Sequence, residues 1–185
     1  MEFIQTHITF TFTTLILLSN IVFVAIVLLL FVHKQFRDLA YAFTEKHVVS
    51  LLFAVSLVAV IGSLSYSEII GFVPCDLCWI QRMFMYPQAI LAFIGLVKKE
   101  KSIVSYLFVL SIIGGFVALY HSLIHWRLIS GSFLACTSSL TAPCAKVYVL
   151  EYGYITIPFM AFSMFVYLIA ITLIYYKSKS NSVDI

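Results

Sequence analysis

Five apolar stretches, each long enough to cross a membrane, constrain this chain more than any other feature. They cover residues 10–32, 48–66, 79–97, 103–124 and 154–176. A helix needs roughly 20 residues to cross the hydrocarbon core, and its backbone is then satisfied internally. With 63% apolar and only 10% charged residues, the 185-residue chain cannot expose this surface to water. The sequence therefore predicts an all-α integral membrane protein.

The basic residues divide the connections into two classes. Three of the eleven, Arg82, Arg127 and Lys146, lie near the second and fourth connections. The other eight follow the first, third and fifth stretches: Lys34, Arg37, Lys46, Lys98, Lys99, Lys101, Lys177 and Lys179. Cytoplasmic loops carry the excess of Lys and Arg. We expect an external N-terminus, a cytoplasmic C-terminus and outward-facing second and fourth connections. The net charge of +3 gives no support for nucleic acid binding.

The stretch 10–32 has two alternative interpretations. It lacks the basic start and the small-residue cleavage site of a signal peptide, and positive charge follows it. We therefore expect a retained helix with a structural role in packing or insertion. Residues 34–46 are expected to be a solvated cytoplasmic connector.

All four cysteines fall into two pairs in the outward connections. Cys75 and Cys78 have the spacing that puts two sulfurs on one side of a first helical turn, and Pro74 suits a helix start. Arg82 follows Cys78 at i+4, so the helix dipole and the cation both favour a thiolate at Cys78. We predict a low pKa for Cys78 and thiol–disulfide chemistry at the membrane surface, with an inert structural disulfide as the alternative.

The second pair, Cys136 and Cys144, encloses seven residues in the longest polar interval. Such a disulfide either staples a surface loop or exchanges with the thiol of another protein. His121 and His125 share one face near the end of 103–124 and could assist proton transfer. An interfacial histidine is often a hydrogen-bonded packing residue, and we favour that structural role for His125 and proton transfer for His121. The two could instead complete a zinc site with the cysteines, although the second pair lacks the spacing of a zinc ribbon. An iron–sulfur cluster is disfavoured for the same reason, and Gln81 remains open between packing and binding.

The motif around the first pair resembles the DsbB-type disulfide bond formation proteins, including the shorter BdbC-like branch. It runs Pro-Cys-Asp-Leu-Cys-Trp-Ile-Gln-Arg over residues 74–82. Further matches are Tyr120-His121, the Cys136 to Pro143-Cys144 loop, and residues 153–158 before the last stretch. The resemblance covers about residues 48–176 and implies a four-helix transmembrane bundle, to which 10–32 adds one N-terminal transmembrane helix.

The resemblance also implies a function: a protein-disulfide:quinone oxidoreductase of the bacterial cytoplasmic membrane. It would reoxidise a secreted, DsbA-like thioredoxin-fold thiol oxidase and pass the electrons to ubiquinone or menaquinone. Cys136 and Cys144 match the partner-facing pair, and Cys75 and Cys78 match the quinone-facing pair. Arg82 matches the arginine that supports quinone reduction, and His121 and Gln81 complete the expected quinone-binding set.

Two departures from the family pattern are the helix at 10–32 and the short Cys136–Cys144 spacing. We expect three parts: an extra helix and connector at 1–46, a DsbB-like domain at 47–177 and a cytoplasmic tail at 178–185. Vitamin K epoxide reductase homologues are a related alternative, but they place the loop pair before the membrane Cys-x-x-Cys. A non-catalytic assembly protein with two structural disulfides is the alternative from a different class.

Overall fold

The computed structural model describes residues 2–129 and 144–183. Every long secondary-structure element in these residues is a helix. The order is α1 (Glu2–Val32), α2 (Lys34–Leu64), the short π-helix η1 (Ser65–Ile69), α3 (Asp76–Lys98), α4 (Ile103–His125) and α5 (Ile157–Val183). All five α-helices are long and apolar enough to cross a membrane. The prediction of an all-α membrane protein is confirmed.

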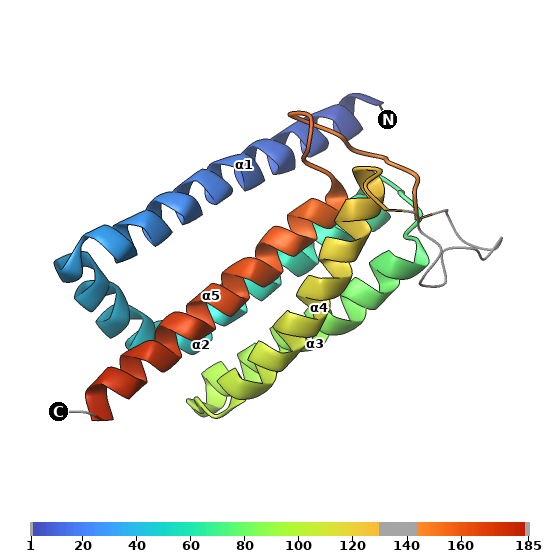
Figure 1. The fold of residues 1–185 in the computed structure, drawn as a ribbon. Coiled ribbons are helices and arrows are strands. Elements are labelled where there is room, and N and C mark those ends of the chain that lie inside the picture. The colour runs from blue at the N-terminus through green and yellow to red at the C-terminus, as the bar shows by residue number, and fades with distance from the viewer. Residues whose placement is uncertain (1, 130–143, 184–185) are drawn as a thin grey trace.

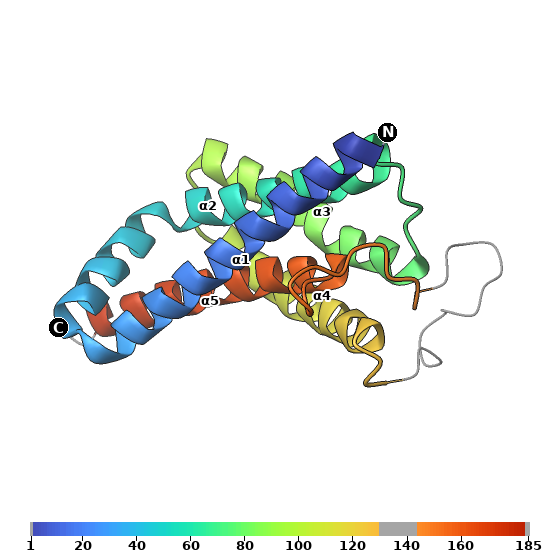
Figure 2. The same ribbon diagram turned by 90° about the horizontal axis from the view of Figure 1, so that it is seen from above.

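Helices α2, α3, α4 and α5 form a bundle, and α1 runs along its side (Figure 1). Each of the four bundle helices contributes to one apolar core, which includes Leu52, Ala92, Leu107 and Phe165. Figure 2 shows α1 lying over the side that α2 and α5 form, away from α3 and α4. The bundle therefore has its own core, and α1 is an addition to its surface.

Several buried hydroxyl groups inside the bundle donate to backbone carbonyls of their own helices. Ser56 donates to the carbonyl of Leu52 at 2.8 Å, and Ser122 donates to that of Ala118 at 2.8 Å. Thr172 does the same with Leu168 at 2.9 Å. A polar group facing hydrocarbon without a partner costs several kcal/mol, so this back-bonding lets Ser and Thr occupy the core.

Residues 34–46 differ from the solvated connector that we expect from the sequence. They are the first turns of α2, which begins directly after His33, and Thr44 is buried. Lys101 donates to the Glu45 carbonyl at 2.7 Å, and Ser178 donates to the Glu45 carboxylate at 3.1 Å. Glu45 therefore links α2 to the α3–α4 turn and to the C-terminal part of α5 at one end of the bundle. The helix α5 continues into the expected tail.

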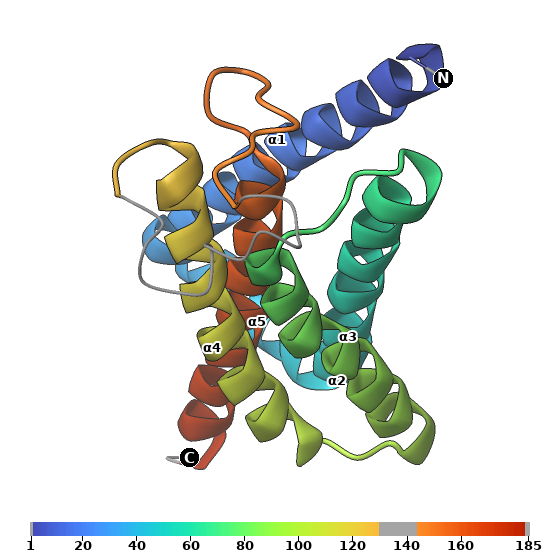
Figure 3. The ribbon, with the colours of Figure 1, turned by 90° about the vertical axis from the view of Figure 1, so that its right-hand side faces the viewer.

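The two ends of the bundle differ in composition. One end holds the α1–α2 and α3–α4 turns and the C-terminal part of α5, where the lysine-rich segments lie (Figure 1). The segment before α3, the end of α4 and the segment before α5 meet at the other end (Figure 3). The described cysteines lie at this second end.

Candidate functional site

Cys75 and Cys78 lie at the start of α3. Cys75 is the N-cap residue, with φ −78° and ψ 173°, and Asp76 opens the helix with an acidic side chain in the first turn. The two sulfurs are 3.1 Å apart, which confirms that the spacing places them on one side of the turn. Bonded sulfurs lie about 2.05 Å apart, so a small side-chain rotation would close a disulfide.

The two thiols of this pair are not equivalent. The hydrogen bond that the Cys75 thiol makes to Cys78, together with burial, raises the pKa of Cys75 to about 12. Cys75 therefore stays protonated at neutral pH. The low pKa expected for Cys78 stays a prediction.

His121 lies against this pair from α4 and is almost fully buried. Its Nε2 is 3.2 Å from the Cys144 carbonyl oxygen and 3.7 Å from the Cys75 sulfur. Because a carbonyl only accepts, the ring proton sits on Nε2 and Nδ1 is the acceptor. The Gln81 amide meets Nδ1 at 2.9 Å and donates to it. Gln81 thus orients the imidazole so that its N–H faces the sulfur of Cys75.

Cys144 is the described member of the second pair, and Cys136 lies outside the described residues. The Cys144 carbonyl accepts a second bond, from His125 Nε2 at 2.9 Å. The side chain is buried in one cluster with Cys75, Leu77 and Ile124. Two imidazoles therefore hold the backbone of Cys144 beside the Cys75–Cys78 pair, and His125 makes the structural hydrogen bond that its place in the sequence favours.

Arg82 lines the same cavity as Cys78 but makes its hydrogen bonds to another helix. Its Nε donates to the Ser63 hydroxyl at 3.0 Å, and its Nη2 donates to the Ser63 carbonyl at 3.1 Å. The guanidinium also lies 5.3 Å from the Trp79 ring centroid. A charge within a membrane span needs such partners. A guanidinium has five N–H donors, and these bonds use two of them.

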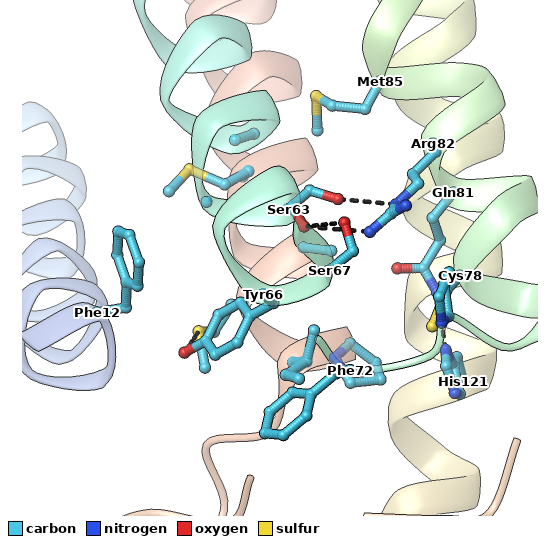
Figure 4. Close-up of a pocket in the computed structure, with 18 of the residues that line it drawn as sticks. Phe12, Ser63, Tyr66, Ser67, Phe72, Cys78, Gln81, Arg82, Met85 and His121 are labelled. Atoms are coloured by element: carbon cyan, nitrogen blue, oxygen red, sulfur yellow. Dashed lines mark hydrogen bonds between the residues drawn. The ribbon is translucent and has the colours of Figure 1, made fainter. Parts of the chain in front are cut away.

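A cavity of about 410 Å³ joins these side chains (Figure 4). Its polar lining residues near the start of α3 include Cys75, Cys78, Gln81 and Arg82, with His121 from α4. In Figure 4, Arg82 points from α3 towards Ser63 on α2, and His121 lies beside Cys78. The volume is within the range of about 300–1,000 Å³ that is usual for small-molecule sites. All three residues of the expected quinone-binding set line this cavity.

Several lining residues are not predicted from the sequence. The Phe72 ring stacks on two tyrosine rings. Its centroid is 6.1 Å from that of Tyr66 and 4.5 Å from that of Tyr148. Phe12 of α1 faces Tyr66 at 5.7 Å. Neither these aromatic residues nor Ser63 belong to a motif, because contacts between helices determine their place in the site. A wall made from α1 was also not expected, since nothing in 10–32 suggests chemistry.

The ligand atoms of Cys75, Cys78 and His121 all lie within 4.8 Å of one another and could hold a metal ion. Two thiolates and an imidazole suit zinc, with one position left open. This set differs from the zinc site considered from the sequence, which also used His125 and the second pair. It requires both thiols to be reduced, since a Cys75–Cys78 disulfide removes two of the three ligands.

The model of one protein family, described as disulfide bond formation protein DsbB, matches residues 45–175. The chain shares 42% identity with the SPbeta prophage-derived disulfide bond formation protein B of Bacillus subtilis (strain 168), over 70% of this chain and 86% of that protein. It shares 35% identity with the disulfide bond formation protein C of the same organism, over 69% and 91%. Identity to the "Probable disulfide formation protein C" of Halalkalibacterium halodurans is 38%, over 67% and 89%. No solved structure matches the chain.

These matches cover most of the chain and most of each relative. The matched range contains the Cys75–Cys78 pair, Arg82, His121 and Cys144, which the fold brings to one end of the bundle. A disulfide formation role implies thiol oxidoreductase chemistry. The chain therefore belongs to the DsbB family of disulfide bond formation proteins.

Proposed function

We propose that this protein oxidises a secreted, DsbA-like thioredoxin-fold thiol oxidase and passes the electrons to a membrane quinone. The observation that carries the proposal is the cavity that Cys78, Arg82 and His121 share at the start of α3. It combines a dithiol, a cation and an oriented imidazole, and Cys144 is buried against the same dithiol. A structural disulfide would need neither the cation nor the imidazole.

The proposed relay begins at the second pair. A thiolate of the partner attacks Cys136, the Cys136–Cys144 bond breaks, and Cys144 leaves as a thiolate. Cys144 then attacks Cys75, the Cys75–Cys78 bond breaks, and Cys78 leaves as a thiolate. The partner's second thiolate displaces Cys136, and Cys136 displaces Cys75 from Cys144. Two electrons and two protons have then moved from the partner's dithiol to Cys75 and Cys78.

The packing of Cys144 supports attack on Cys75 rather than on Cys78. Cys75 and Cys144 are both fully buried members of one cluster, whereas Cys78 is partly exposed at its edge. Attack on Cys75 releases Cys78 into the cavity, on the same helix as Arg82. Both cysteines line the cavity with Arg82, and the leaving sulfur is that of Cys78, which lies one helical turn before Arg82 on α3.

The donor set of the cavity fits a quinone, either ubiquinone or menaquinone. When bound, the quinone supplies an acceptor for two electrons and two protons. Arg82 would hold a quinone oxygen and stabilise negative charge that develops on it. His121, whose Nε2 carries the proton, would donate that proton, and Gln81 would keep the ring in this orientation. The raised pKa of Cys75 makes its thiol a proton reservoir beside the imidazole.

The division of charge between the bundle ends supports an orientation in a bacterial cytoplasmic membrane. The end with the α1–α2 and α3–α4 turns carries most of the basic residues and would face the cytoplasm. The N-terminus and both cysteine pairs would then face outwards, towards an exported partner. In the proposed division of the chain, residues 1–46 add to a DsbB-like domain at 47–177, followed by a tail at 178–185.

Quinone reduction by purified protein tests this function. A reduced thioredoxin-fold partner is supplied with ubiquinone-1 or a menaquinone analogue, and the quinone absorbance is followed for the natural protein and for Cys78→Ser. We expect turnover with at least one quinone and none with Cys78→Ser. Intact disulfides that resist the partner, without quinone loss, would instead favour an assembly protein with structural disulfides.

The same purified protein distinguishes a zinc-binding protein from a thiol:quinone oxidoreductase. Zinc is added to protein with reduced or oxidised cysteines, and bound zinc is measured after gel filtration. A zinc protein would retain one equivalent when reduced and would show no quinone turnover. A thiol:quinone oxidoreductase would turn over without added metal and with a chelator present.

A further inference from the structure

The cavity at the redox site extends to a helix that the family match does not include. Phe12, Leu15, Ile16 and Ser19 of α1 line it together with Cys78 and Arg82. Their spacing of three, one and three residues places them on one face of the helix. Figure 4 shows Phe12 on the far side of Tyr66 from the cysteines. The cavity thus spans the distance between the start of α3 and α1.

The character of the cavity changes along this direction. Opposite α1 lie Val58, Ala59 and Gly62 of α2, with Met160, Ala161 and Met164 of α5. Their side chains are apolar, whereas the groups near α3 include a cation, an imidazole and two thiols. Methionine is flexible and adapts to irregular apolar shapes. The α1 side therefore suits a hydrocarbon chain and not a second polar group.

The α1 side of the cavity is also open to the bilayer. Leu15 and Val58 both line the cavity, yet they are 56% and 54% exposed. These two residues belong to α1 and α2, so the opening lies between these helices. Only 6% of the most apolar window of α1 is buried, against 28% to 33% in the other four helices. The α1 helix stands beside the bundle without filling the space.

Side-chain hydrogen bonds hold α1 in this position. The Tyr167 hydroxyl of α5 donates to the Asn20 side-chain oxygen at 2.6 Å and lies 2.9 Å from the Ser19 hydroxyl. Thr14 meets the Tyr152 hydroxyl at 3.0 Å. These hydrogen bonds tie α1 to α5 and to the segment that precedes it. They account for a helix that borders the cavity rather than closing it.

We propose that α1 forms the outer wall of a subsite for the isoprenoid tail of the quinone, an inference that rests on the proposed function. The headgroup lies at Arg82 and His121, and the tail runs past Tyr66 between α1, α2 and α5 into the bilayer. The polar-to-apolar order of the cavity matches the order of headgroup and tail. Its opening between Leu15 and Val58 supplies the exit for a tail longer than the cavity.

Tail-length selectivity tests this subsite with a matched pair of variants. Leu15 lines the cavity, and Leu18, one turn away, is equally exposed at 53% but does not. Leu15→Trp and Leu18→Trp are compared with two quinones that share a headgroup, one with a long isoprenoid tail and one without a tail. We expect Leu15→Trp to lower kcat/KM for the long-tailed quinone about tenfold, the scale of overpacking. Its kcat/KM for the tailless quinone, and both values of Leu18→Trp, should stay unchanged.

A binding readout accompanies the kinetics. A quinone with a photoreactive group on its tail should label the α1 peptide that contains Leu15 in the natural protein, and labelling should fall in Leu15→Trp but not in Leu18→Trp. If Leu15→Trp does not assemble, Leu15→Ala replaces it, and its KM should rise for the long-tailed quinone alone.

Three results would overturn the subsite. If Leu15→Trp lowers kcat/KM equally for both quinones, Leu15 does not act on the tail. If the photoreactive quinone labels only other helices, the tail does not lie against α1. Labelling of the α1 peptide by a photoreactive phospholipid that the long-tailed quinone cannot displace would assign the space to lipid. The failure of the natural protein to reduce either quinone is a separate result, because it would remove the proposed function itself.

Discussion

The bundle of α2 to α5 and the added helix α1 are both apolar, yet they are held in place differently. The bundle buries a continuous core around Leu52, Leu107 and Phe165. The α1 helix buries little of its surface and depends on hydrogen bonds to Tyr167 and Tyr152. Lipid is as apolar as leucine, so an apolar helix surface gains little by leaving it. Close packing therefore holds the bundle helices together, whereas a few polar contacts position the helix that borders the cavity.

The largest effect is expected at Arg82, where the bundle supplies the only cationic group proposed to act on the quinone. Arg82→Ala should lower quinone turnover by about 100- to 1,000-fold, the usual cost of removing a donor that stabilises developing charge. The measurement is quinone absorbance with a reduced partner. Ser63→Ala is the matched control, because it leaves the backbone carbonyl that accepts from Arg82 Nη2. Normal quinone kinetics in Arg82→Ala would show that quinone reduction does not take place at Arg82 in this cavity.

Alkylation rates test whether the thiols of Cys75 and Cys78 differ in reactivity at the end of the bundle. A pKa of about 12 leaves the Cys75 thiol protonated at pH 7, so it should react with iodoacetamide about 100-fold more slowly than an ordinary cysteine. Its rate should rise about tenfold per pH unit until the pH approaches that pKa. Mass spectrometry of the reduced protein gives the rates at Cys75 and Cys78 separately and also tests the low pKa predicted for Cys78.

The control for this experiment removes the first cause of the shift. In Cys78→Ala the hydrogen bond that the Cys75 thiol makes to Cys78 is lost, while burial, which raises the pKa of Cys75, and His121, which lowers it, remain. Cys75 should then react faster at neutral pH than it does in the natural protein. Equal reactivity of Cys75 and Cys78 in the natural protein, with the same pH dependence, would contradict the asymmetry of the pair.

Length and hydropathy alone predict the helices of both regions, because a membrane span leaves the backbone few alternatives. The Cys75–Cys78 geometry is also predictable, since both residues lie within one local turn. Two contacts of the site are not predictable from the sequence: the hydrogen bond of Ser63 with Arg82 and that of His125 with the Cys144 carbonyl. Each residue meets its partner only where helices distant in sequence come together, and one sequence carries no signal of such a contact.

The place of α1 beside the cavity is not predictable from the sequence for a related reason. Its stretch at 10–32 carries no charge and no motif, so an insertion or packing role is the natural prediction from the sequence. The spacing of Phe12, Leu15, Ile16 and Ser19 gains meaning only when the cavity beside them is known. Equally apolar residues elsewhere on α1 face lipid. A cavity wall and a lipid-facing surface have the same composition in a membrane protein.

Glycine substitutions separate the packed bundle from the loosely attached helix by stability. A Cβ at Gly114 of α4 would collide with the Phe165 ring, whereas one at Gly115 would lie 3.5 Å from Phe165 Cβ in ordinary contact. Gly114→Ala should therefore cost about 1–3 kcal/mol, and Gly115→Ala should be near neutral. Leu28→Ala on exposed α1 should cost less than about 0.5 kcal/mol. Unfolding in detergent mixtures checks all three, and a similar cost at Leu28 would contradict the loose attachment of α1.

A small effect is expected where α1 meets α5. Tyr167→Phe removes the hydroxyl that bonds to Ser19 and Asn20. Hydrogen bonds between membrane helices contribute about 0.6 kcal/mol each, so losing two should favour detachment of α1 by about 1 kcal/mol, roughly a fivefold change. Because Phe keeps the ring, the ring contact with Phe23 at 4.8 Å should survive. We therefore expect α1 to loosen without leaving the bundle.

Spin-labelled noncanonical residues at Leu28 of α1 and Leu173 of α5, both exposed, would measure this loosening as a broader distance distribution in Tyr167→Phe. Tyr106→Phe is the matched control, because Tyr106 is exposed on α4 and away from α1. A distribution as narrow as in the natural protein would show that the Tyr167 hydroxyl does not hold α1. If α1 loosens while turnover with a tailless quinone is unchanged, attachment and chemistry reside in different parts of the molecule, as the contrast between α1 and the bundle requires.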